Sequence, residues 1–138
     1  MTDDAGTASA GAPCGFALHE RLQADTLPVG RLALSRLLLM NDATYPWLIL
    51  VPERPDVREI IELAAADRLT LMEEIADVSR ALTAMVHPDK LNVAAIGNLV
   101  PQLHIHVVAR FRSDPAWPAP VWGRTPPRPY SPAAAAEM

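Results

Sequence analysis

The sequence predicts an α+β domain, in which a mostly antiparallel sheet packs one face against a single long helix. Three observations predict this fold: short apolar runs flanked by turn residues, one long stretch with apolar residues at helical spacing, and two further runs joined by a short loop. With 138 residues, the chain has the length of one domain with a substantial core. We expect this domain to span residues 16–114, between a flexible leader at residues 1–15 and a proline-rich extension at residues 115–138.

Several segments are expected before the long helix. Residues 16–27 should form a short helix or an irregular segment, closed by a turn at Pro28-Val29-Gly30. Residues 31–40 alternate at first and then become apolar, which predicts a strand whose end is fully buried. Residues 41–46 have turn chemistry, and residues 47–51 form the next apolar strand.

The long helix is expected to begin between Ala64 and Asp67 and to end at His87, because a proline follows it. Its apolar residues form one stripe, with spacings of four, three, four and three: Leu71, Ile75, Val78, Leu82 and Met85. The charged residues that fall largely off this stripe are expected to be solvated: Glu73, Glu74, Asp77 and Arg80. Residues 90–96 and 102–111 are predicted to be the last two strands, joined by a short turn.

The C-terminal extension has a different character from the rest of the chain. Residues 115–138 contain seven prolines, so no core element is expected there. The segment nevertheless carries three large apolar side chains: Trp117, Val121 and Trp122. We therefore predict that residues 116–123 lie across the domain or a partner subunit, and that residues 133–138 trail off.

Composition and charge narrow the function classes. The net charge of −4 gives no basic footprint for a nucleic-acid polymer. No apolar run approaches the roughly 20 residues that span a bilayer. The acidic pair Asp3 and Asp4 stands where a signal peptide carries positive charge, and the single cysteine, Cys14, has no partner for a disulfide. We expect a cytoplasmic protein.

The most informative motif is the stretch from Gln102 to Val108, QLHIHVV. Because successive strand side chains point to opposite faces, Gln102, His104 and His106 are predicted to share one face. The opposite face would be apolar and carry the residues between them: Leu103, Ile105 and Val107. We expect the imidazole face to be open to solvent, where histidine can act as nucleophile, proton donor or proton acceptor near neutral pH.

These residues resemble the signature of the histidine triad (HIT) family, His-φ-His-φ-His-φ-φ with φ apolar, with Gln102 in place of the first histidine. The run from Trp47 to Pro52 is similar to that family's strand that ends in proline, and Asn41 resembles the family's asparagine at the preceding turn. The resemblance covers about residues 31–111. It implies the HIT-like fold, with about five strands, one long helix and a shorter helical segment.

The resemblance also implies a function. HIT proteins are hydrolases and transferases that act on nucleoside phosphoramidates, dinucleoside polyphosphates and nucleotidyl sugars. By position, His104 would attack the α-phosphorus to form a nucleotidyl-histidine, and His106 would contact the phosphate. Asn98 and the backbone near Gly97 would hold the phosphate from the loop, and Asn41 would face the ribose. No cofactor and no metal are expected, and the family resemblance suggests a homodimer in which two sheets join.

Two residues depart from the family pattern. Gln102 can form hydrogen bonds but cannot titrate. Trp47 stands where many relatives carry another histidine, and we expect it to contact the substrate. The motif also admits a second register, in which His104 is the first histidine and His106 the middle one. Residues 107–110 fit the sequence expected after the motif better in the first register.

Two other functions remain open from the sequence. A non-catalytic nucleotide-binding module is one, because the first histidine of the motif is absent. A metal-binding protein is the other, since His104 and His106 have the spacing of two zinc ligands on a strand. A third ligand would then come from His19, His87 or a carboxylate, and no partner for it is apparent nearby in the sequence.

Overall fold

The structure is a computed structural model that describes residues 15–137. The predicted leader at residues 1–15 falls almost entirely on residues 1–14, which include Cys14 and lie outside the described residues. In chain order the elements are α1 (Glu20–Asp25), β1 (Thr26–Arg31), β2 (Ser35–Met40), β3 (Trp47–Pro52), the 3-10 helix η1 (Ile60–Glu62), α2 (Ala65–Val86), β4 (Lys90–Ala94), β5 (Ile105–Arg110) and α3 (Pro132–Glu137).

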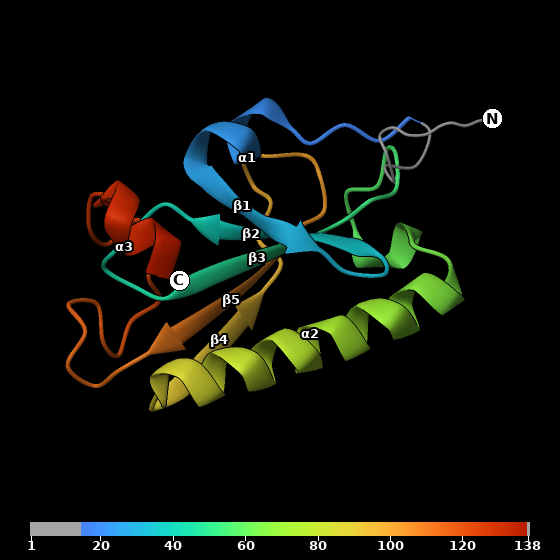
Figure 1. Ribbon diagram of the computed structural model, residues 1–138. Helices are drawn as coiled ribbons and strands as arrows, with labels where there is room; N and C mark the ends of the chain where they lie inside the picture. Colours follow the sequence, from blue (N-terminus) through green and yellow to red (C-terminus); the bar gives the residue numbers. More distant parts are fainter. Residues whose placement is uncertain (1–14, 138) are drawn as a thin grey trace.

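The five strands form one sheet in the order β1-β2-β3-β5-β4, and every neighbouring pair is antiparallel. The helices α1 and α2 lie on opposite sides of this sheet (Figure 1). The predicted α+β fold, with a five-stranded antiparallel sheet and one long helix, is therefore confirmed. Strand β5 lies between β3 and β4, so the histidine motif enters the sheet at an interior position.

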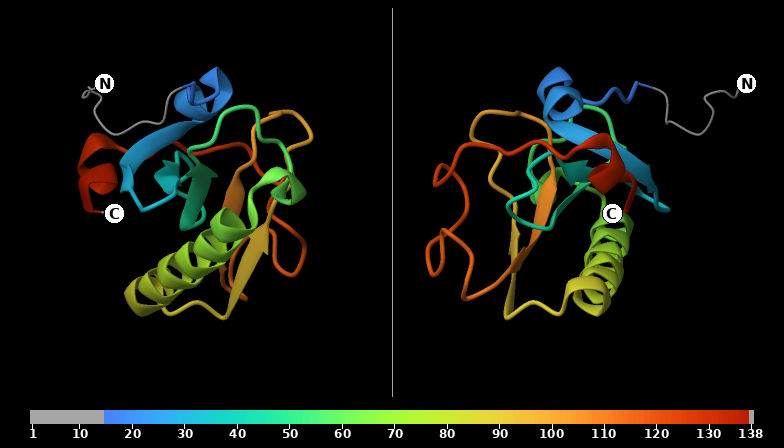
Figure 2. Two further views of the ribbon diagram at one scale, coloured as in Figure 1. Left: turned by 90° about the vertical axis from the view of Figure 1, so that its right-hand side faces the viewer. Right: turned by 60° about the vertical axis from the view of Figure 1, so that its left-hand side comes forward.

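Each face of the sheet has its own hydrophobic core. The core beneath α2 consists of Leu34, Leu50, Leu63, Leu71, Val78, Leu82, Leu103, Ile105, Val107 and Ala109. The core on the other face, which includes residues of α1 and of the C-terminal segment, consists of Phe16, Leu22, Leu38, Tyr45, Trp47, Ile49, Val51, Val100, Val108, Ala116 and Val121. Figure 2 shows α2 as a rod set diagonally against the strands.

The alternation predicted for the motif strand is present within β5. Ile105 and Val107 pack toward α2, whereas His106 and Arg110 lie among the residues of the opposite face. The strand is shorter than predicted, because residues 102–104 and Phe111 lie outside it. The neighbouring strand β4 likewise ends at Ala94.

The sequence prediction was wrong at the start of the sheet. Pro28-Val29-Gly30, predicted to be a closing turn, belongs to strand β1, and the predicted strand at residues 31–40 is interrupted before Ser35. β1 and β2 form a hairpin whose register shifts between Pro28 and Gly30. Because β1 is an edge strand with an irregular register, it tolerates a proline that donates no hydrogen bond.

Helix α2 confirms most of the predicted stripe and corrects one charged residue. It ends at His87, whose left-handed backbone (φ 50°) closes the last turn. Glu74, predicted to be solvated, is buried, and its carboxylate accepts the backbone N–H of Leu34 at 2.7 Å. The apolar Met85, at the end of the predicted stripe, is 53% exposed. Glu74 is therefore buried because it supplies the hydrogen-bond acceptor for the N–H of Leu34, in the loop between β1 and β2.

The C-terminal segment is fixed to the sheet by a buried ion pair. The guanidinium of Arg110 is 1% exposed and contacts both carboxylate oxygens of Asp114 at 2.8 and 3.0 Å. This bonding lowers the pKa of Asp114 to about 2. Beyond it, Ala116 and Val121 are buried in the core. Residues 133–138 were predicted to trail off, but helix α3 (Pro132–Glu137) includes all of them except residue 138, which lies outside the described residues.

Candidate active site

The two histidines of the motif lie side by side on the face of the sheet that α1 and the C-terminal segment cover. Their ring centroids are 4.9 Å apart, and the two residues are only 6% and 5% exposed. The expectation that the imidazole face is open to solvent is therefore wrong. The ring of Trp122 covers His106, with a centroid separation of 5.2 Å. Both imidazoles instead face a cavity beside the strand.

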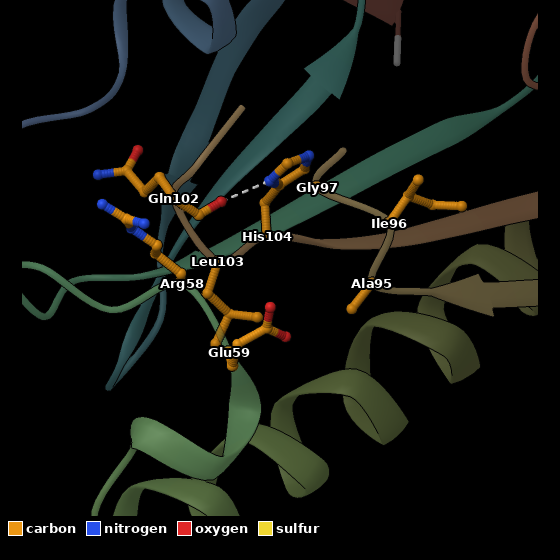
Figure 3. A pocket seen from close by; sticks show the side chains of 8 residues that line it. All are labelled: Arg58, Glu59, Ala95, Ile96, Gly97, Gln102, Leu103 and His104. Carbon is orange, nitrogen blue, oxygen red and sulfur yellow. Dashed lines mark hydrogen bonds between the residues drawn. The ribbon is translucent and has the colours of Figure 1, made fainter. Parts of the chain in front are cut away.

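The hydrogen bond made by His104 fixes which of its nitrogens is free. Its Nδ1 lies 2.7 Å from the backbone carbonyl oxygen of Gln102 (Figure 3). Because a carbonyl only accepts, Nδ1 carries the proton and Nε2 keeps its lone pair. Burial lowers the pKa of His104 from its ordinary value, and the nearby charge of His19 acts in the same direction. His104 is thus a neutral imidazole with a nucleophilic Nε2.

His106 has the opposite tautomer. The indole Nε1–H of Trp47 donates to Nδ1 of His106 at 2.9 Å. Since an indole N–H only donates, Nδ1 must be the unprotonated nitrogen and Nε2 carries the hydrogen. Burial, helped by His104, lowers the pKa of His106 to about 3. Two adjacent imidazoles therefore present one lone pair and one N–H donor, which suits attack on a phosphorus and contact with its oxygens.

A cavity of about 370 Å³ lies beside both histidines. Gly97, in a left-handed conformation (φ 62°), and Asn98 contribute to its wall from the loop between β4 and β5. Its apolar lining consists of Leu22, Met40, Ile96, Leu99, Val100 and Trp122. The structure thus brings His104, His106, Gly97 and Asn98 together around one cavity, which lies within the usual size range of small-molecule sites, about 300–1,000 Å³.

Gln102 does not line this cavity with its side chain. The side-chain Oε1 accepts the backbone N–H of His19 at 2.8 Å, and Nε2 donates to the backbone oxygen of Ala17 at 2.8 Å. In Figure 3 the amide points away from the His104 ring. The side chain of Gln102 therefore holds the segment before α1, on the side of the sheet that also carries His106, and only its backbone oxygen contacts His104.

Asn41 and Trp47 border a second cavity rather than the one beside the histidines. This cavity measures about 550 Å³. Asn41 Oδ1 accepts the backbone N–H of Tyr130 at 2.9 Å, which engages one of its two polar atoms. Trp47 is 6% exposed and reaches the histidine cavity only through His106.

Sequence reasoning missed most of the residues that line the cavity, among them Arg21 and Trp122. Arg21, on α1, lines both cavities, and nothing in its sequence context indicated this. Trp122 also lines both cavities. The sequence did carry a signal for Trp122, since a large aromatic residue in a proline-rich segment predicts a packing contact, but it did not indicate the surface it contacts.

The donor set for a metal ion is incomplete in the part of the chain that the structure describes. Within residues 15–137, no three side chains of His, Cys, Asp or Glu converge so that they could hold a metal ion. Both Nδ1 atoms of the motif are engaged in hydrogen bonds, with Gln102 and Trp47.

Among residues 15–137, none of the helices has the length and apolar character that a membrane-spanning helix needs.

Comparison with known proteins identifies the family. A family model described as the HIT domain matches residues 21–113, about two thirds of the chain. The chain belongs to the HIT, or histidine triad, family. Proteins of this family are generally nucleotide hydrolases or transferases, so membership indicates a nucleotide-related activity. No curated protein showed a significant match to the chain.

Three solved structures resemble the chain over most of its length. A histidine triad protein from Bradyrhizobium japonicum is 50% identical, with a TM-score of 0.88, and the match covers 89% of this chain and 92% of that one. One from Marinobacter aquaeolei is 49% identical, with a TM-score of 0.87 and coverages of 88% and 89%. A third, from Sinorhizobium meliloti, is 43% identical, with a TM-score of 0.87 and coverages of 88% and 90%.

The lowered pKa of His104 predicts the acid limb of the pH profile. Attack by His104, the role expected from the family resemblance, requires the neutral ring, and the pKa of His104 lies below the ordinary value of 6.5. We therefore expect kcat/KM to be flat above that pH and to fall only at lower pH, where Nε2 becomes protonated. A pH–rate profile of nucleotide turnover measures this. An acid limb with its midpoint above pH 6.5 would contradict the assignment.

The two side-chain hydrogen bonds of Gln102, to His19 and Ala17, predict a modest loss of stability when this side chain is removed. Gln102→Ala removes the partners of the His19 N–H and the Ala17 carbonyl, at a cost of about 1 kcal/mol. Thermal unfolding followed by circular dichroism measures the shift in Tm. Gln23→Ala, at an exposed position of α1, is the matched control. Equal Tm values for the two variants would show that these two hydrogen bonds do not stabilise the fold.

Proposed function

We propose that the chain is a nucleotide-phosphate hydrolase or nucleotidyl transferase that works through a nucleotidyl-histidine intermediate on His104. The observation that carries the proposal is the pair of opposite tautomers, with a free Nε2 lone pair on His104 and an Nε2–H on His106. Both rings line one cavity with Gly97 and Asn98. Substrates of this type are phosphoramidates, dinucleoside polyphosphates and nucleotidyl sugars.

In the first step, Nε2 of His104 attacks the α-phosphorus. A nitrogen–phosphorus bond forms and the bond from phosphorus to the leaving group breaks, so that the leaving group takes the electron pair and a proton from water. The ring gains positive charge as it attacks. The carbonyl oxygen of Gln102, 2.7 Å from Nδ1, stabilises that charge by accepting the Nδ1–H bond.

His106 and the loop act on the phosphate oxygens. The Nε2–H of His106 donates to a non-bridging oxygen, and the backbone near Gly97 and the amide of Asn98, which line the same cavity, add further donors. In the second step, the hydroxyl oxygen of water or of another acceptor attacks phosphorus and its proton passes to solvent, while the nitrogen–phosphorus bond breaks and its electron pair returns to Nε2 of His104. The imidazole is then ready for another turnover.

The test is turnover of adenosine phosphoramidate, followed by chromatography of the released AMP. We expect steady release of AMP, with a burst of leaving group when breakdown of the intermediate is slower than its formation. Binding of AMP in a calorimeter without hydrolysis of phosphoramidate, dinucleoside polyphosphate or nucleotidyl sugar would overturn the proposal. That outcome would support a non-catalytic nucleotide-binding module, which the non-titrating Gln102 favours.

We further propose that the protein acts in the cytoplasm as a homodimer, with residues 115–138 as an extension packed partly on the domain. The burial of Ala116 and Val121 supports the packing of the extension. Gel filtration tests the dimer, which should elute at twice the mass of the chain. Elution at the mass of a single chain would contradict it.

A further inference from the structure

His19, the residue before helix α1, is joined to the candidate nucleophile through Gln102. The backbone N–H of His19 donates to Oε1 of Gln102 at 2.8 Å, although 83 positions separate the two residues in the sequence. The backbone oxygen of Gln102 in turn accepts the Nδ1–H of His104 at 2.7 Å (Figure 3). One residue therefore contacts both His19 and His104, and the mechanism proposed above gives His19 no role.

The ring of His19 also caps α1. Its Nδ1 accepts the backbone N–H of Arg21 at 3.0 Å, and its backbone oxygen accepts the N–H of Gln23 at 3.0 Å. Because a backbone N–H only donates, Nδ1 is unprotonated and the hydrogen of the neutral ring lies on Nε2. Such a cap satisfies a donor that a helix leaves unpaired at its start. Since α1 has only six residues, its first turn depends on His19.

Helix α1 forms part of the wall of the histidine cavity. Arg21, Leu22 and Asp25 line that cavity together with His104. Leu22 is buried in the core, whereas the side chains of Arg21 and Asp25 are more than half exposed. Since the cap of α1 and the bond to Gln102 both start at His19, this residue fixes the α1 wall relative to the nucleophile.

The ring of His19 is accessible to solvent. It is partly exposed and lines a cavity of about 280 Å³ together with Asp56 and Gln102. A histidine that water can reach exchanges protons with solvent, so the ring has a neutral form and a charged form. The charged form cannot cap α1, because its Nδ1 then carries a hydrogen and has no lone pair for the N–H of Arg21.

Charged and titratable groups lie around His19 and His104 on several elements. Those near His19 belong to α1 and to the loop after β3: Glu20, Arg21, Asp25 and Asp56. Those that line the cavities beside His104 are Arg21, Asp25, Arg58, Glu59 and His106. The two guanidinium and two carboxylate groups in this second set are opposite in charge and largely offset one another. Burial lowers the pKa of His104 most, and the charge of His19 lowers it further.

We propose that His19 is a positioning residue of the candidate active site, which acts on His104 through Gln102 and on the cavity wall through the first turn of α1. This inference rests on the proposed function. The neutral ring caps α1 and keeps Arg21 and Leu22 against the cavity. The charged ring favours the unprotonated form of His104, whose Nε2 attacks phosphorus, so the nucleophile stays available as the pH falls.

The test separates the cap from the charge with two substitutions at position 19. His19→Asn keeps a side-chain oxygen that can cap α1 but never carries charge, whereas His19→Ala removes both functions. Gln23→Ala, at an exposed position of the same helix, is the matched control. At neutral pH we expect His19→Ala to lower kcat/KM for adenosine phosphoramidate about fivefold, mostly through KM because α1 is a wall of the cavity, and His19→Asn to stay within about twofold of the wild type.

A second measurement needs no substrate. Nitrogen-15 NMR titration of the His104 ring gives the pKa of its imidazole directly. This pKa should rise in both His19→Asn and His19→Ala, because the neighbouring charge is lost, and should stay unchanged in Gln23→Ala. A residue that only capped α1 would leave the pKa of His104 unchanged in His19→Asn.

Three results would each overturn the inference: an unchanged pKa of His104 in His19→Asn, wild-type kcat/KM in His19→Ala, or an equal loss of kcat/KM in the two variants. If His19→Ala fails to fold, His19→Asn decides the question through the pKa of His104. If the wild type turns over no nucleotide substrate, the proposed function fails, and the NMR comparison still decides whether His19 acts on His104.

Discussion

Substituting alanine for His104 is expected to lower kcat by at least about 10³-fold, or about 4 kcal/mol, while nucleotide binding persists. His104 is the group whose Nε2 lone pair is free, because its Nδ1–H is held by the Gln102 carbonyl. No other imidazole in the cavity can replace it, since the Nε2 of His106 carries hydrogen. The measurement is steady-state turnover of adenosine phosphoramidate, together with calorimetry of AMP binding.

The matched control removes an imidazole elsewhere. His87 closes helix α2 with a left-handed backbone (φ 50°), a conformation that asparagine tolerates, so His87→Asn should keep the fold and full activity. Turnover by His104→Ala at more than a tenth of the wild-type rate would remove His104 from the role of nucleophile. A loss of AMP binding in the same variant would instead indicate that His104 mainly holds the ligand.

Replacing Trp47 with phenylalanine is expected to lower kcat about 10- to 100-fold, with a smaller effect on KM. The ring shape is largely kept, but the Nε1–H that donates to Nδ1 of His106 at 2.9 Å is lost. His106 can then place its hydrogen on either nitrogen, and the tautomer with Nε2–H, the phosphate donor of the proposed mechanism, is no longer enforced. The magnitude follows the effect of removing other groups that orient a functional histidine.

Two measurements separate this positioning role from a simple loss of packing. Nitrogen-15 NMR of the histidine rings should show His106 protonated at Nε2 in the wild type and a mixture of tautomers in Trp47→Phe. Trp122→Phe removes an indole N–H that has no hydrogen-bond partner in the described residues while keeping a ring over His106, so it should change kcat little. Unchanged kcat and an unchanged tautomer in Trp47→Phe would refute the assignment.

The sequence predicted the fold well where one signal dominated. Helical spacing defined α2 to within its first turn, and the proline after His87 marked its end. The start of the sheet was mispredicted because Pro28 reads as a turn residue, whereas its edge position lets it stay in β1. Glu74 was mispredicted because charged side chains are normally exposed to solvent. Only the folded chain brings the N–H of Leu34 within hydrogen-bond distance of its carboxylate.

The site was predictable in part for a similar reason. The motif and its loop identified His104, His106, Gly97 and Asn98, which the structure places around one cavity. Strand periodicity could not show that the side chain of Gln102 holds the segment before α1 rather than lining the cavity, because its partners His19 and Ala17 are more than 80 residues away in the sequence. The residues beside them, such as Arg21 and Trp122, come from distant parts of the chain, and no local pattern encodes which surface such residues meet.

The most direct test of the mechanism is the site of covalent attachment. The protein is mixed with adenosine phosphoramidate, quenched in alkali to preserve nitrogen–phosphorus bonds, digested and analysed by mass spectrometry. An adenylyl group on the peptide that carries the motif, localised to His104 by fragmentation and absent from His104→Ala, is the predicted result. Complete turnover without any adduct on His104, or with the adduct on His106, would contradict it.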